Sequence, residues 1–148
     1  MSNLGGIDEE VQKDELREEQ DTNVEKKRRP FHYWKVSENK EYRLKLNTSM
    51  IEKLENKYRD NIMNVVVGDD IPPLSVMLTV IQAAMVPWEH GIKYDDVKNI
   101  YENWKENGGN QMQLYTDVVM PTMVVSGFFT DYQARSIMEG LKAMDELA

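Results

Sequence analysis

The sequence contains no cysteine, and this single absence excludes several kinds of chemistry. Without a thiol there is no disulfide framework, no thiolate metal site and no cysteine nucleophile. Histidine is almost as scarce, because only His32 and His90 are present as ordinary acid–base groups near neutral pH. The eight glycines form neither a dinucleotide-binding motif nor a Walker phosphate loop. We therefore expect no enzyme, no cofactor and no metal site.

Long apolar runs and an excess of positive charge are also missing. No apolar run approaches the roughly 20 residues that a membrane-spanning helix needs, and the acidic N-terminus has no apolar signal core. The chain has 26 acidic and 18 basic residues, a formal net charge of −8. Nucleic-acid binding requires a basic face that neutralises phosphates. We expect a soluble cytoplasmic protein with neither a nucleic acid nor a membrane as a partner.

The first 29 residues differ in composition from the rest of the 148-residue chain. They contain nine acidic and six basic residues, no aromatic residue, and only scattered apolar positions. Such a segment buries too little apolar surface to offset the entropy lost on ordering. The sequence predicts a disordered charged arm over residues 1–29 and a single mainly helical domain over residues 30–148.

A β-hairpin is expected where this domain begins. Residues 31–36 are aromatic and β-prone, residues 42–46 alternate apolar and basic side chains, and the polar residues between them suit a turn. A helix follows, with Ser49 and Glu52 at the spacing of a capping box. The run at residues 64–67 is either a short strand or the frayed end of this helix, and we favour a short extended segment.

Further helices are indicated by apolar spacings of three and four residues. The segment 74–86 follows two prolines and is apolar nearly all round, which is typical of a buried central helix. Another helix starts at Asp95 or Asp96. A third starts at Asn110 and is kinked or interrupted at Pro121, and the last begins at Thr130 or Asp131. The predicted fold class is a mainly α, small helical domain of four to five helices with a short N-terminal β-hairpin.

The ten methionines suggest a surface that adapts to a partner. Five of them follow residue 105, and the segment 120–129 carries no charge. We expect partner contacts at Met120, Met123, Phe128 and Phe129. A methionine on an apolar helical stripe also serves commonly as core filler, so that interpretation stays open.

Two other functional interpretations also remain open. Glu89 and His90 are neighbours in a connecting segment, where a small ligand-binding domain or enzyme could place its site. Alternatively, a non-catalytic regulatory adaptor could bind its partner through the charged arm, residues 1–29.

Several stretches of the chain are similar to one protein family. The segments EYRLKLNTSMIEKLENKYRDNIMNVV, LSVMLTVIQAAM, HGIKYDDVKNIYENW and VVSGFF occur in this order. They resemble the tail assembly chaperones of long-tailed (siphovirus) phages and of prophages of Gram-positive bacteria, which are functional counterparts of the lambda G protein. The resemblance covers residues 33–129. Its motifs are the Leu-x-Leu strand, Leu54-Glu55, His90-Gly91 and Ser126-Gly127-Phe128.

The resemblance implies a non-catalytic role in virion morphogenesis. Members of this family bind the tape measure protein, keep it soluble and help to recruit tail tube subunits. They act in the bacterial host cytoplasm and are absent from the mature virion. In this family a frameshifted, C-terminally extended product contacts the tail tube protein. The amino-acid sequence does not show whether this chain has such a product, and it leaves self-association open.

Overall fold

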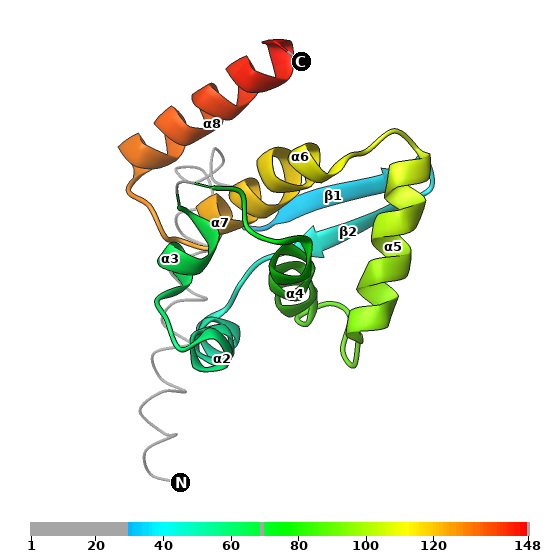
Figure 1. The fold of residues 1–148 in the computed structure, drawn as a ribbon, viewed down its shortest axis with the longest axis horizontal. Coiled ribbons are helices and arrows are strands. Elements are labelled where there is room, and N and C mark those ends of the chain that lie inside the picture. Colours follow the sequence, from blue (N-terminus) through cyan, green and yellow to red (C-terminus); the bar gives the residue numbers. More distant parts are fainter. Residues whose placement is uncertain (1–29, 69, 148) are drawn as a thin grey trace, which may run out of the picture.

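The computed structural model describes residues 30–68 and 70–147 (Figure 1). Within them the fold is mainly helical, with one two-stranded antiparallel sheet on the N-terminal side. This confirms the predicted fold class. The expected disordered arm, residues 1–29, lies outside the described residues. No helix among the described residues is long and apolar enough to span a membrane.

The predicted hairpin is confirmed as β1 (His32–Ser37) paired with β2 (Lys40–Leu44). Trp34 and Val36 are buried, whereas the alternate residues Tyr33 and Lys35 are exposed. This alternation follows from the two-residue period of a strand, which turns successive side chains to opposite faces. One face of the hairpin therefore joins the core and the other meets solvent.

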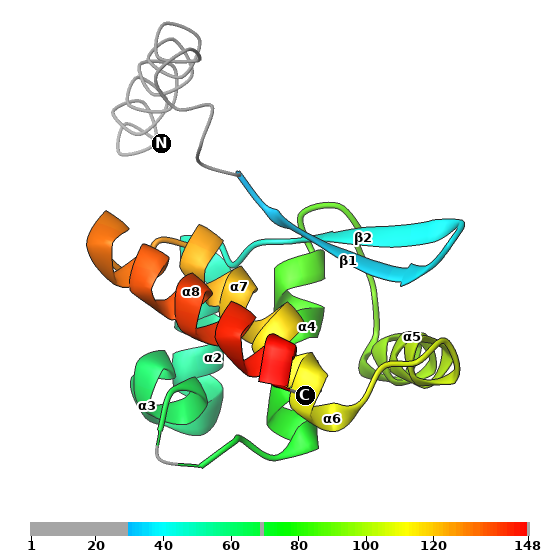
Figure 2. The ribbon, with the colours of Figure 1, turned by 90° about the horizontal axis from the view of Figure 1, so that it is seen from above.

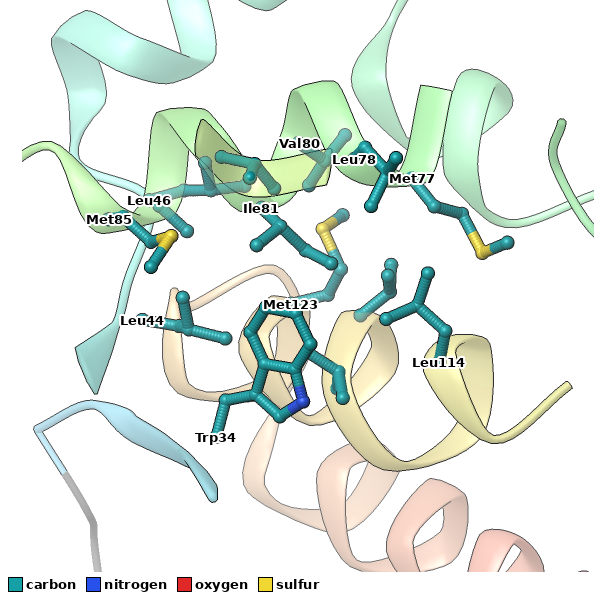
Figure 3. Close-up of a cluster of buried hydrophobic side chains, with 14 of the residues drawn as sticks. Trp34, Leu44, Leu46, Met77, Leu78, Val80, Ile81, Met85, Leu114 and Met123 are labelled. Carbon is teal, nitrogen blue, oxygen red and sulfur yellow. The ribbon is translucent and has the colours of Figure 1, made fainter. Parts of the chain in front are cut away.

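Helix α4 (Leu74–Met85) passes through the middle of the domain, as its apolar sequence predicted. Its start follows Pro72 and Pro73, where a proline in the first turn loses no helical hydrogen bond. Figure 3 shows side chains of α4 facing Trp34 and Leu44 from the hairpin and Leu114 and Met123 from the C-terminal helices. The buried residues of α4 are Met77, Leu78, Val80, Ile81, Ala84 and Met85.

The first helix is α2 (Thr48–Tyr58), and its cap differs from the expected one. Asn47 is the N-cap, and its side-chain Oδ1 accepts a hydrogen bond from the Met50 backbone N–H at 2.9 Å. The predicted capping box of Ser49 and Glu52 is therefore wrong, because Ser49 already lies inside the first turn. Asparagine and serine cap helices about equally well, so spacing alone favoured the wrong residue.

Residues 64–66 are helical, so the predicted extended segment is also wrong except at Val67. They belong to the short helix α3 (Ile62–Val66), whose N-cap is Asn61. A carboxylate oxygen of Glu55 accepts the Ile62 N–H at 3.0 Å. Ile62 and Val66 are one turn apart and both are buried. Burial of this pair and the caps at the helix start override the preference of valine for strands.

Helix α5 (Tyr94–Glu106) begins slightly before the expected start at Asp95 or Asp96. Lys93 is the N-cap residue, and the Asp96 carboxylate accepts its backbone N–H at 2.9 Å. After α5, Gly109 passes directly over the Trp104 ring. A Cβ atom at residue 109 would lie 2.4 Å from that ring, so the position accommodates only glycine.

The next helical stretch contains a π-helical segment immediately before Pro121. It comprises α6 (Gln111–Gln113), η1 (Leu114–Val119) and α7 (Met120–Val125), and Asn110 caps its start as expected. Pro121 has no N–H for the carbonyl of Asp117, its partner in an α-helix. His32 Nε2 from β1 lies 2.8 Å from that carbonyl oxygen and donates to it. The helical stretch continues through Pro121 to Val125, so the proline does not end it; the regular α-helical pattern is replaced by a π-helical one just before the proline. The contact of His32 with the Asp117 carbonyl links this stretch to the hairpin.

The last helix is α8 (Asp131–Leu147). Thr130 Oγ1 accepts the Gln133 N–H at 3.1 Å, and Gln133 Oε1 accepts the Thr130 N–H at 3.0 Å. This reciprocal cap confirms the predicted restart at Thr130 or Asp131. Figures 1 and 2 place α8 along the outside of the α6–α7 layer.

Replacing Gly109 by alanine is expected to destabilise the domain by about 1–3 kcal/mol, because the added methyl group collides with the Trp104 ring. Urea unfolding measures this change. Gly140→Ala is the matched control, since no atom lies within 4 Å of the added Cβ and alanine favours a helix. An equal loss of stability in both variants would contradict the role of the Trp104 contact.

Pro121 and His32 are expected to be energetically coupled through the Asp117 carbonyl. His32→Ala removes the side-chain donor and should cost about 1 kcal/mol of unfolding free energy. The cost should be smaller in a Pro121→Ala background, because alanine at this position supplies an N–H for the same carbonyl. A double-mutant cycle by urea unfolding measures the difference. Equal costs in both backgrounds would show that His32 stabilises the fold through other contacts.

Candidate functional site

Met120 and Met123, two of the four predicted contact residues, lie in the hydrophobic core. Met120 is 5% exposed and Met123 is fully covered. Both belong to α7, which packs against η1 and β1. In this structure they present no surface to a partner, so the core-filler interpretation holds for them. Their spacing of three residues places them on the same inward face of the helix.

Phe128 and Phe129, the other two predicted contact residues, lie in the connection between α7 and α8. Both are partly buried and pack against the edge of the core. Ser126 fixes the start of this connection, because its Oγ accepts the Leu46 N–H at 2.9 Å and donates to the Thr122 carbonyl at 2.6 Å. Gly127 follows with a φ of +88°, which turns the chain sharply into the two phenylalanines. The phenylalanines thus lie at the margin of the core.

Helix α8 extends this apolar margin. None of the side chains described in α8, residues 131–143, is fully buried, and Ala134, Ile137 and Leu141 are only partly covered. Tyr132 is 75% exposed and Met138 is 41% exposed, although both are large apolar residues. We refer to Phe128, Phe129, Tyr132 and Met138 together as the α7–α8 surface. It is the candidate protein-contact site.

A second candidate is an open pocket of about 450 Å³ beside Glu89 and His90. Its walls come from the hairpin residues Lys40 and Tyr42, from the α4–α5 connection and from the start of α5. The structure therefore brings the Glu89–His90 pair together with a phenol and an ammonium group. Glu89 and His90 are both exposed, so this pocket is wet and shallow.

The chemistry of this pocket is governed by a neutral phenol. Partial burial raises the pKa of Tyr42 above its ordinary value of 10.0, and the negative charge of Glu89 raises it further. Burial alone also raises the pKa of Tyr115 in η1. A raised phenol pKa favours a hydrogen-bond donor over a nucleophilic phenolate. Within the part of the chain that the structure describes, no cluster of three or more histidine or acidic residues could hold a metal ion.

An aromatic cluster occupies the outer side of the hairpin. The Phe31 ring lies 4.8 Å from Tyr33 and 5.4 Å from Trp88, edge to face in both cases. The Arg43 guanidinium lies 5.6 Å from the Phe31 ring and 5.9 Å from the Trp88 ring. These contacts anchor the first described residues to the α4–α5 connection.

Sequence reasoning missed Tyr132 as an exposed aromatic residue. Its position in the first turn of α8 places it opposite the stripe formed by Ile137 and Leu141. Helical spacing could have identified it, because 132 falls about half a turn away from that stripe. Reasoning from composition singled out methionine instead, and of the described methionines after residue 105 only Met112 and Met138 are exposed.

Comparison of the chain with protein-family models, with curated proteins and with solved structures found no match.

The Tyr42 phenol should respond to the charge at Glu89. Glu89→Gln is expected to lower the Tyr42 pKa but leave it above 10.0, because burial is the larger cause. Titration of tyrosine ring resonances by NMR measures the change. Tyr115, whose pKa is raised by burial alone, should not move. Glu41→Gln on the same hairpin is the control.

The same shift sets a pH dependence of stability. Because the folded pKa exceeds the unfolded value of 10.0, the contribution of Tyr42 is fully present below that pH and is lost as pH rises through the folded pKa. For the variant described above, a Tyr42 pKa that is unchanged in Glu89→Gln would show that Glu89 is too far away to act on the phenol.

Proposed function

We propose that this chain is a phage tail assembly chaperone that binds the tape measure protein through the α7–α8 surface. The observation that carries the proposal is the incomplete cover of α8, which leaves Tyr132 and Met138 exposed in the helix that follows two partly buried phenylalanines. The resemblance over residues 33–129 supports the same role.

The physical demands of this role match the surface. A tape measure protein is a long apolar helical chain before the tail tube surrounds it, and exposed apolar helices aggregate. Aromatic and methionine side chains contact such helices well, because they offer large area and adapt to different neighbours. The net charge of −8 favours solubility of the complex. Several copies along one tape measure would add avidity to a modest individual affinity.

The proposal includes the later steps that the family resemblance implies. The complex helps to recruit tail tube subunits, and the chaperone leaves as they polymerise, so it acts in the host cytoplasm and is absent from the mature virion. The role is non-catalytic and requires no cofactor. It is compatible with self-association of the chaperone along its client.

Replacing Tyr132 and Met138 together by serine should weaken capture of the tape measure protein at least severalfold, because both side chains lie in the proposed contact. Co-expression followed by pull-down and a solubility assay of the tape measure protein measures the loss. Both residues are exposed, so helical circular dichroism should be unchanged.

The structure provides a matched control with the same residue types. Tyr33 is 43% exposed on the hairpin and Met112 is 49% exposed at the start of α6. Replacing these two by serine should leave capture intact. Equal losses in the two double variants would contradict a contact at the α7–α8 surface. Capture that survives both variants but requires residues 1–29 would favour the adaptor alternative.

A further inference from the structure

A groove of about 190 Å³ runs between α2 and α4, on a part of the molecule separate from the α7–α8 surface. Met50 and Leu54 from α2 and Ala83 and Val86 from α4 and its C-cap form its apolar lining. Figure 1 shows the two helices next to each other, with α2 below α4. Met50, Ala83 and Val86 are only partly buried, so apolar surface remains accessible in the groove.

The two uncharged polar side chains in the groove, Thr79 and Gln82, already have partners in the fold. Thr79 Oγ1 donates to the Ser75 carbonyl at 2.7 Å, within α4. Gln82 Nε2 donates to the Ile92 carbonyl at 3.2 Å, which ties α4 to the connection that leads into α5. An occupant therefore meets a largely apolar floor. It does not have to supply hydrogen bonds to Thr79 or Gln82, because both side chains are already bonded within the fold.

The rim of the groove is positively charged. Lys53 and Lys57 line it and lie one helical turn apart on the same side of α2. Among the residues that the structure describes, the lining includes no carboxylate, and α4 carries no charged residue at all. The neighbouring Glu55 points instead to the Ile62 N–H. A chain of net charge −8 thus has a basic, apolar groove.

The N-terminal segment of the same chain has the complementary composition. Residues 8–25 contain nine acidic and two basic residues, a formal charge of −7. Leu4, Ile7 and Val11 supply apolar side chains at spacings of three and four. An acidic segment with an apolar stripe is the kind of ligand that a lysine-rimmed apolar groove binds.

The point where this segment joins the body lies close to one end of the groove. Phe31 packs against Trp88 with ring centroids 5.4 Å apart, and Arg43 covers both rings. Trp88 is only two residues beyond Val86, which lines the groove. The chain therefore enters the described fold beside the C-terminal end of α4, and only residues 26–30 separate this point from the last acidic residue of the segment, Glu25. A tethered segment binds at a high effective concentration.

We propose that the acidic N-terminal segment, residues 1–25, docks into the α2–α4 groove of its own chain. The apolar stripe occupies the floor, and the carboxylates face Lys53 and Lys57. The contact covers the basic groove in the free protein. The inference is independent of the proposed tape measure contact, which uses another surface.

Paramagnetic relaxation NMR on the full chain tests this docking directly. The chain has no cysteine, so Gln12→Cys creates a unique site for a nitroxide label in the acidic segment. The label should broaden the amide resonances of Lys53, Lys57 and Ala83 more than those of α5. The broadening should fall by roughly half or more when salt shortens the Debye length from about 10 Å to about 3 Å.

A charge reversal and a matched control identify the site. Lys53→Glu with Lys57→Glu should abolish the selective broadening. Lys98→Glu with Lys142→Glu makes the same charge change on α5 and α8 and should leave it intact. Should the first pair perturb the fold, neutralising Asp14, Glu15 and Glu18 as amides tests the same contact from the arm, without altering the groove.

Three results would overturn the proposal. The first is broadening that is absent or uniform over the domain. The second is selective broadening that persists when both lysines are reversed or the three acids are neutralised. The third comes from a mixing experiment, in which one chain carries only the isotope label and the other carries only the nitroxide. Selective broadening in the isotope-labelled chain would show that the segment binds the groove of a second copy. Loss of tape measure capture with this docking intact would affect only the proposed function.

Discussion

The fold depends on covering most of the surface of α4. Its residues are apolar nearly all round, and six of the twelve are buried. No single neighbour can cover such a helix, because one packed element shields only one face. The hairpin, α2, α3, α5 and η1 each contact α4. The hydrophobic effect acting on this one helix therefore explains why a small sheet and several short helices assemble into a single core.

Most of the elements could be predicted from local patterns, because each is marked by periodicity or by a cap. The hairpin alternates buried and exposed residues, α4 is bounded by prolines, and Thr130 opens α8. The predictions failed where contacts between distant parts of the chain determine the local structure. Residues 64–66 have strand propensity, yet they are helical because Ile62 and Val66 are buried together. Nothing local to η1 indicates that His32, 85 residues away, reaches the Asp117 carbonyl.

The candidate site also depends on tertiary contacts that local sequence patterns do not show. Met120, Met123, Phe128 and Phe129 share one uncharged segment, so composition treats them alike. Their burial differs because Met120 and Met123 lie in α7 against the core, whereas the turn at Gly127 carries the phenylalanines to its margin. The α2–α4 groove could not be predicted from the sequence either, because its two walls are separated along the chain and only packing brings them together. The sequence shows that Lys53 and Lys57 are four residues apart, but it does not show which apolar residues of α4 lie next to them.

The core is complete without α8, and this has a consequence for how the molecule can use its surface. The buried apolar residues run from Trp34 to Met123, and none of the side chains described in α8 is among them. Contacts of α8 with a partner therefore need not disturb the packing around α4. An element with few buried contacts belongs to the low-stability end of a structure, where binding surfaces are commonly found. The same demand that concentrates the apolar residues around α4 leaves α8 partly covered and available for contact.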